Sequence, residues 1–246
     1  MQATDSVDIK GLVRFSYLTR GGFNLSKQGL DAARAVLYDP ARLDRRFRFF
    51  ETWALPSLTN QTDQNFQTGI LITDDFPDAA RARLETLVTG IDNVHMVVRP
   101  PMEHIQACKA GFEALPERED VSHVATFRLD DDDAMHRETI ARIRDIANRL
   151  LALREGDKPM CIAFNRGFYL DVNNEETPVT EVYERAPLGV GMAVVAPKGA
   201  HVTVFRRNHR HIAQYYDTYT EVQRPMFLRS VHDDNDSIPT LSLIHI

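Results

Sequence analysis

Cysteine is scarce in this chain of 246 residues, which contains only Cys108 and Cys161. Two cysteines are too few for a disulfide framework, and their spacing does not fit a metal site. Both lie among apolar residues, so we expect two reduced thiols in a protein core. This expectation fits a protein of the cytoplasm, where thiols are kept reduced.

Long apolar runs are also missing from the sequence. None approaches the roughly 20 residues that cross a bilayer, and the first eight residues are polar and acidic, unlike a signal peptide. We therefore expect no transmembrane segment, and the sequence leaves peripheral contact with a membrane open.

Positive charge is in deficit, with 29 Lys and Arg against 35 Asp and Glu and a net charge of -6. Nucleic-acid binding depends on clustered positive charge, so we expect no nucleic-acid partner. A local basic pocket for a phosphorylated ligand remains compatible with this balance.

Several motifs of common enzyme classes are absent. There is no G-x-x-x-x-G-K-[ST] loop, no G-x-S-x-G elbow and no G-x-G-x-x-G after the first expected strand. The spacing of the acidic residues does not match an EF-hand loop either. These absences argue against P-loop ATPases and kinases, α/β-hydrolases and EF-hand proteins.

What is present is an alternation of strand and helix patterns. We expect strands at residues 12–17, 68–73, 94–98 and 123–129, and helices at residues 43–58 (interrupted by Pro56), 79–88, 105–115 and 138–153. This order predicts an α/β fold with a mainly parallel central sheet flanked by helices. The remainder is less regular, with expected strands at residues 160–164, 167–172 and 191–195 and a helix near residues 208–219.

No linker separates two domains, so we expect a single domain over residues 1–240. Residues 11–155 form its nucleotide-binding half and residues 156–240 its acceptor-side half. Residues 241–246 read Leu-Ser-Leu-Ile-His-Ile, which is the translation of a common transposon-end sequencing adapter, CTG TCT CTT ATA CAC ATC. We interpret them as a sequencing artefact and leave them out of the fold.

Four consecutive carboxylates, Asp130, Asp131, Asp132 and Asp133, follow the expected strand at residues 123–129. We call these residues the acidic run. Open α/β sheets bind their ligands at the carboxyl ends of strands, and Mg²⁺ or Mn²⁺ prefers carboxylate oxygens together with substrate phosphates. The position therefore predicts a metal and diphosphate site. A solvated acidic turn is the alternative interpretation.

The acidic run resembles the D-x-D signature of metal-dependent glycosyltransferases with the GT-A fold. A closer resemblance, from about Leu12 to Asp236, is to the putative rhamnosyltransferase family, and it rests on Arg14-Phe15, Phe49-Phe50-Glu51, Leu55-Pro56-Ser57-Leu58, Gln61-Thr62, Phe66 and Ile72-Thr73-Asp74. This resemblance implies a GT-A-like domain that transfers a sugar, by the family's label rhamnose, from a nucleotide-diphosphate donor to a glycan or glycolipid. It also implies Mn²⁺ or Mg²⁺ as cofactor.

Site residues follow from strand ends and from the resemblance. Expected contacts to the nucleotide sugar come from Arg14, Asp74, Asp75, Arg99, Asp130 and Asp131. The resemblance implies metal ligands at Asp132, Asp133 and His232. The repeated aspartates leave open whether Asp130 works with Asp132 or Asp131 with Asp133. Arg128 is expected to pair with the run, and Trp53 and its neighbouring phenylalanines are expected to pack in the core.

A catalytic base stays unassigned at this stage, with candidates Asp171, Glu175, Glu176, Glu181 and Glu184. Two other functions remain open as well. A nucleotidyltransferase would also set carboxylates and a metal against a diphosphate, and a non-catalytic sugar- or metal-binding module would keep the fold without turnover.

Overall fold

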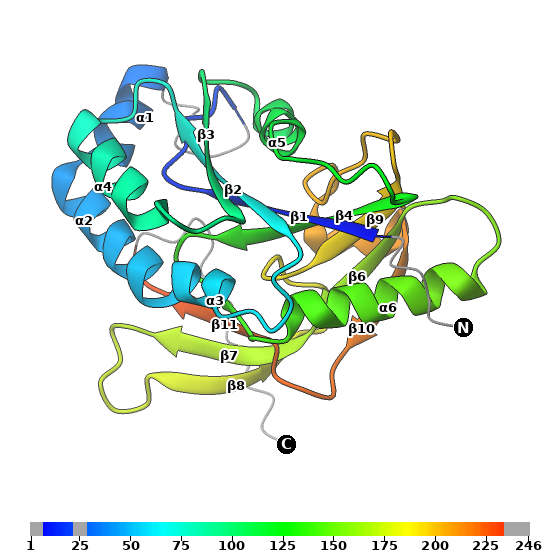
Figure 1. Ribbon diagram of the computed structural model, residues 1–246. Helices are drawn as coiled ribbons and strands as arrows, with labels where there is room; N and C mark the ends of the chain where they lie inside the picture. Colours follow the sequence, from blue (N-terminus) through cyan, green and yellow to red (C-terminus); the bar gives the residue numbers. More distant parts are fainter. Residues whose placement is uncertain (1–6, 22–28, 234–246) are drawn as a thin grey trace.

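The computed structural model describes residues 7–21 and 29–233 (Figure 1). The suspected adapter residues 241–246 lie outside this part of the chain. A seven-stranded sheet forms the centre, in the order β10-β6-β9-β4-β1-β2-β3. Its strands are β1 (Val7–Arg14), β2 (Gln67–Thr73), β3 (Val94–Arg99), β4 (His123–Asp130), β6 (Met160–Phe164), β9 (Ala193–Pro197) and β10 (Asp217–Glu221).

Strands β3, β2, β1 and β4 are all parallel, and β9 runs antiparallel to its neighbours β4 and β6. The sheet is therefore mainly parallel, as the sequence predicts. Strands β1, β2 and β6 are buried along nearly their whole length, which fits the apolar runs in β2 and β6, whereas β1 also buries Asp8 and Lys10.

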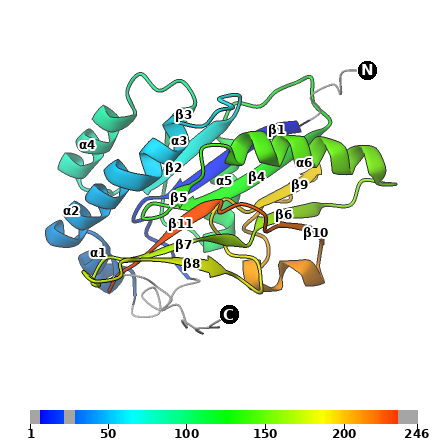
Figure 2. The ribbon, with the colours of Figure 1, turned by 90° about the horizontal axis from the view of Figure 1, so that it is seen from below.

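Helices cover both faces of the central sheet (Figures 1 and 2). One core cluster contains the inner residues of α2 and α6, and a second cluster on the other face contains those of α5. The helices are α1 (Leu30–Leu37), α2 (Pro40–Phe49), α3 (Leu55–Thr59), α4 (Asp78–Val88), α5 (His104–Glu113) and α6 (Thr139–Leu153). Within the described residues, no helix combines the length and apolar character that a membrane crossing requires.

The helix expected at residues 43–58 is present, but it changes from an α-helix to a π-helical turn and back to an α-helix. Between α2 and α3, residues Phe50–Ala54 form a π-helical turn, η2, in which the N–H of Leu55 bonds to the carbonyl of Phe50. Pro56 lies in the first turn of α3 and cannot donate the hydrogen bond of a regular helix. The wider turn before it lets the chain continue without a break.

A second, four-stranded sheet packs below the first in the view of Figure 1, in the order β5-β11-β7-β8. Its strands are β5 (Ala134–Met135), β7 (Arg166–Asp171), β8 (Val179–Tyr183) and β11 (Phe227–Val231). Strand β5 starts directly after the acidic run, so the run connects the two sheets. Strand β11 pairs with β5 and ends one residue before His232.

Gln61 fixes the chain near this connection, because its buried amide bridges two helices. Its Nε2 donates to the carbonyls of Ser57 and His136, at 2.6 and 2.9 Å. Its Oε1 accepts from the N–H of Ile140 at 3.0 Å. The side chain thus ties the end of α3 to the start of α6.

The prediction of a helix near residues 208–219 is wrong. The structure has a short 3₁₀-helix, η3 (His209–Gln214), followed by β10. Strand β10 pairs in parallel with the buried strand β6, and its Thr-Tyr-Thr segment suits an extended chain. The helical spacing of apolar residues there was too short a pattern to outweigh this pairing.

Candidate functional site

The acidic run lies where the parallel strands of the central sheet end. Arg14 and Asp130, the last residues of β1 and β4, are register partners, and Thr73 and Arg99 are the corresponding pair of β2 and β3. These residues therefore share one edge of the sheet, the edge that binds ligands in open α/β folds.

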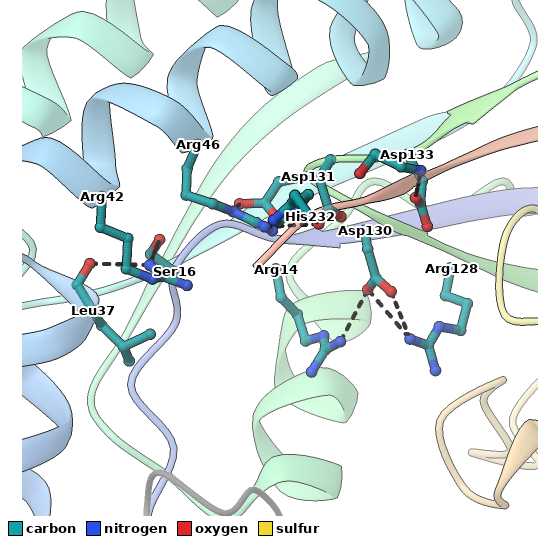
Figure 3. Close-up of polar contacts among 12 residues, drawn as sticks. Arg14, Ser16, Leu37, Arg42, Arg46, Arg128, Asp130, Asp131, Asp133 and His232 are labelled. Atoms are coloured by element: carbon teal, nitrogen blue, oxygen red, sulfur yellow. Dashed lines mark hydrogen bonds and ion pairs between the residues drawn. The ribbon is translucent and has the colours of Figure 1, made fainter. Parts of the chain in front are cut away.

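Asp130 lies between two arginines (Figure 3). Arg14 donates to its Oδ1 at 2.9 Å, and Arg128 donates to Oδ1 and Oδ2 at 3.2 and 3.0 Å. Burial alone would favour the protonated acid, but the positive charges of Arg128 and Arg14 hold the pKa of Asp130 well below its usual range. The expected pairing of Arg128 with the run is confirmed.

The same two guanidinium groups lie against an aromatic ring. The centroid of Phe205 is 5.5 Å from the guanidinium carbon of Arg14 and 5.2 Å from that of Arg128. Two positively charged guanidinium groups thus contact the single carboxylate of Asp130 within the described residues. Such a group suits an anion, above all a phosphate, which arginines bind through paired hydrogen bonds.

Two histidines near this pair are kept neutral. Burial, with the charges of Arg14 and Arg128, lowers the pKa of His104 to about 3. Burial, with the charges of Arg128 and Arg210, lowers the pKa of His209 to about 4. Both rings are therefore uncharged at neutral pH, and the arginines carry the positive charge of this cluster.

The next aspartates meet a different arginine, Arg46 of α2. Its Nε donates to Asp131 Oδ2 at 3.1 Å, its Nη2 donates to Asp131 Oδ1, and its Nη1 donates to Asp132 Oδ2 at 2.7 Å. Arg46 is only 7% exposed, and the two aspartates are 2% and 5% exposed. One guanidinium therefore bridges two buried carboxylates.

His232 reaches the same carboxylate from the second sheet. Its Nε2 lies 2.8 Å from Asp132 Oδ2, although the two residues are 100 positions apart in the chain. Phe49 packs against the His232 ring at 4.6 Å between centroids and stacks on Trp53 at 5.0 Å. Phe47 and Phe50 lie in the core as expected, whereas Phe49 and Trp53 are half-buried outside the core clusters of the described residues and pack beside the imidazole.

Asp133 turns away from Arg46, toward strand β11 (Figure 3). Its Oδ1 accepts the N–H of Ser230 at 3.0 Å. Burial, together with the negative charges of Asp132 and Asp130, raises the pKa of Asp133 well above its ordinary value.

These positions rule out the solvated acidic turn as a description of the run. Asp131, Asp132 and Asp133 are all at most 5% exposed. Buried carboxylates need cations or protons nearby, and the structure provides arginines and an imidazole.

The chemistry of the expected metal ligands fits a divalent ion, because carboxylate oxygens and an imidazole nitrogen are suitable donors. The present arrangement is less favourable. Among residues 7–21 and 29–233, no three side chains of His, Cys, Asp or Glu converge as a metal site. Arg46 donates a hydrogen bond to Asp132, and Asp133 accepts one from Ser230 of strand β11. Metal binding by Asp132, Asp133 and His232 stays a prediction.

The other expected donor contacts lie on the same edge but apart from the arginine pair. Asp74 and Asp75 follow β2 and are exposed. Asp75 accepts hydrogen bonds from Arg34 in α1 and from Tyr38, the residue directly after that helix. Arg99 donates to the carbonyls of Val98 and Ala110. The structure shows no contact within the described residues that joins these three to Asp130. Their roles stay predictions.

The base candidates lie on or beside the second sheet. Glu175 and Glu176 are exposed, and Glu181 is paired with Arg166. Asp171 accepts the N–H of Asn173 at a turn. Glu184 accepts hydrogen bonds from the hydroxyl of Tyr169 and, at 2.5 Å, from Arg210. These contacts hold the side chains of Tyr169 and Arg210 together.

Four residues of the site were not predicted from the sequence: Arg46, His104, Phe205 and His209. Only Arg46 could have been recognised from the sequence pattern. It lies three residues after Leu43 and next to Phe47, on the apolar side of an amphipathic helix, where a charged residue needs a buried partner. The other three come from separate elements, and only the fold brings them together.

Comparisons with known proteins agree with this architecture. Residues 8–242 match the family model described as "Putative rhamnosyl transferase". The chain is similar to S. aureus TarS 1-349 with a TM-score of 0.51 and 10% identity, over 91% of this chain and 60% of that one. The complex of that protein with UDP gives a TM-score of 0.49 and 11% identity, with the same coverage.

The chain spans about 60% of the length of these TarS structures, and identity this low speaks only for the fold. No curated protein matches the sequence. The expected GT-A-like fold, a single sheet-centred α/β domain, is confirmed. Because the family model covers nearly the whole chain, this protein belongs to the putative rhamnosyl transferase family of glycosyltransferases.

Proposed function

We propose that this chain transfers a sugar, by its family rhamnose, from a nucleotide-diphosphate donor to a hydroxyl group of a glycan or glycolipid. The observation that carries the proposal is the buried charged cluster at the carboxyl ends of β1 and β4, in a chain of this family. In the reaction the acceptor oxygen bonds to the anomeric carbon as the bond from that carbon to the diphosphate breaks. The diphosphate leaves with the bonding electrons, and the hydroxyl proton passes to a base.

The arginine pair is the proposed diphosphate-binding part of the site. Arg14 and Arg128 bring two positive charges to the single carboxylate of Asp130 within the described residues, and Phe205 orients both guanidinium groups. Donor phosphate oxygens would complete their hydrogen bonding. Arg14 and Asp130 thus keep their proposed donor role, and Asp74, Asp75, Arg99 and the buried Asp131 remain proposed donor contacts.

The proposed cofactor is Mn²⁺ or Mg²⁺, with Asp132, Asp133 and His232 as ligands. When bound, such an ion neutralises negative charge on the leaving diphosphate. Asp132 and His232 already meet at 2.8 Å, which supports this ligand set. The two buried, free cysteines support a reducing, cytoplasmic location.

The test is a screen of nucleotide sugars with purified protein, with and without Mn²⁺. Binding to the folded state raises the melting temperature, so the true donor is found by its thermal shift. Nucleoside diphosphate release in the presence of glycan acceptors then measures transfer. Release that needs no acceptor would indicate a hydrolase, and pyrophosphate chemistry with a sugar phosphate would indicate a nucleotidyltransferase.

Asp132→Asn is the matched variant, because it removes one charge while keeping the shape of the side chain. We expect it to lower turnover by about 100-fold or more, as loss of a charged group at the leaving diphosphate does. Asp120→Asn, at an exposed position, is the control and should leave turnover unchanged. If the wild type cleaves no nucleotide sugar and none raises its melting temperature, the proposed transfer is wrong and the chain is a binding module.

A further inference from the structure

The guanidinium of Arg46 contacts two carboxylates of the acidic run, and one of them, Asp132, is an expected metal ligand. Three of its nitrogens donate to the carboxylates of Asp131 and Asp132. The Asp132 oxygen that accepts from Arg46 is the same one that faces His232. A metal ion bound to this oxygen would therefore have to compete with the Arg46 guanidinium for it.

The charges of the cluster explain why a cation belongs there. Asp131, Asp132 and Asp133 bring three carboxylates into a region almost without solvent. Burial raises the pKa of Asp131 above its ordinary value although Arg46 opposes this, whereas the pKa of Asp132 falls below its ordinary value against burial because of Arg46 and His232. Conversely, the two carboxylates raise the pKa of Arg46 above its ordinary value despite burial. The protein thus carries its own counter-charge for part of the acidic run.

Helix α2 holds this guanidinium in position. Leu43 and Phe47, its helical neighbours on the apolar side, are buried in the core, and the Phe47 ring packs against Phe15 at 4.7 Å. Arg46 therefore enters the acidic run from a rigid element and not from a loop. Its side chain has flexible methylene groups, so the guanidinium can leave the carboxylates while the helix stays in place.

We propose that Arg46 is a built-in cation of the acidic run that competes with a divalent metal ion for Asp132. In the metal-free protein it places one positive charge between Asp131 and Asp132 and keeps the run folded. A metal ion binds only when the guanidinium releases Asp132. This inference rests on the ligand set of the proposed function, because it takes Asp132 as a metal ligand.

The experiment compares Arg46→Gln with wild type by titration with Mn²⁺, following free Mn²⁺ by electron paramagnetic resonance and melting temperature by circular dichroism. Glutamine keeps hydrogen-bonding capacity but removes the charge. We expect Arg46→Gln to bind Mn²⁺ about 10- to 100-fold more tightly than wild type, the range that groups next to metal ligands control. In EDTA its melting temperature should fall below that of wild type, and Mn²⁺ should restore it.

Arg48→Gln is the control from the same helix, since Arg48 is exposed and pairs only with Asp44 within the described residues. It should bind Mn²⁺ like the wild type. Equal Mn²⁺ affinity of Arg46→Gln and wild type would overturn the proposal, and so would an equal gain in the Arg48→Gln control.

Arg46→Lys decides the matter if Arg46→Gln does not fold. Lysine keeps the buried charge, but a single ammonium group does not span both carboxylates as a guanidinium does. We expect it to fold and to bind Mn²⁺ more tightly than wild type; unchanged affinity would again refute the competition. Because the readout is Mn²⁺ binding, it is independent of sugar transfer. Tighter Mn²⁺ binding without any donor cleavage would refute the proposed function and leave the role of Arg46 standing.

Discussion

At the scale of single residues, the two arginines on Asp130 illustrate how charge is distributed in this site. A lone buried carboxylate would be costly, and a single arginine would neutralise it. Here Arg14 and Arg128 both donate to it, so two positive charges meet one carboxylate within the described residues. Loss of one arginine should therefore affect anion binding more than it affects the ion pair, because Asp130 keeps a partner.

We expect Arg128→Gln to raise the KM for the donor about tenfold, which corresponds to about 1.4 kcal/mol of binding free energy. A charge-assisted hydrogen bond to phosphate has this magnitude. Steady-state kinetics with the donor found by the screen will measure the change. Arg149→Gln, an exposed residue of α6, is the control, and an unchanged KM in Arg128→Gln would place the diphosphate elsewhere.

At the scale of elements, the acidic run depends on connections made by its neighbours along the chain. Strand β4 brings it to the sheet edge, β5 carries the chain into the second sheet, and β11 returns beside β5 with His232. Gln61 ties α3 to the start of α6 behind this connection. One amide thereby fixes two elements that flank the run.

We expect Gln61→Leu to lower the free energy of unfolding by about 2–4 kcal/mol, because it leaves buried backbone groups without partners, each costing about 1–3 kcal/mol. Urea denaturation followed by circular dichroism will measure the loss. Asn60→Ala removes one exposed hydrogen bond to Pro56 and should cost less than 1 kcal/mol. Equal stability of the two variants would show that the Gln61 bridge is not what holds these helices.

At the scale of the whole molecule, the burial of two histidines close to positive charges makes stability depend on pH. Burial, assisted by nearby arginine charges, lowers the pKa of His104 in α5 to about 3 and that of His209 in η3 to about 4. In the unfolded chain a histidine titrates near pH 6.5. Between these values the unfolded state binds more protons, so stability rises with pH from about 4 to about 6.5.

We expect the protein to lose about 1–2 kcal/mol per histidine between pH 7 and pH 5 from these two rings. Asp130 adds a further loss at lower pH, because its pKa is below that of the unfolded chain. Urea denaturation at pH 7, 6 and 5 will measure this slope. The double variant His104→Gln and His209→Gln should flatten it, and an unchanged slope would assign the acid sensitivity to other groups.

The sequence by itself determined the alternation of strands and helices in the first half, except for helix α1 (Leu30–Leu37), which it did not predict. The apolar runs of β2 and β4 and the amphipathic pattern of α6 are local features of the sequence. They predict a buried strand or a helix with one buried face whatever the order of the strands in the α/β sheet. The acidic run and its place at a strand end were equally readable, and so was the family. The less regular second half was harder, since β10 is a strand only because β6 lies beside it.

Only the tertiary structure decided which charges meet. Arg46 and Asp132 are 86 residues apart, and His232 is 100 residues from Asp132. No sequence pattern links positions so distant, because their contact depends on how two sheets join at β5 and on where α2 packs. The energy of a buried charge is set by the partner within a few ångströms. The four carboxylates were therefore visible in the sequence, while the contact of two of them with Arg46 was a property of the fold.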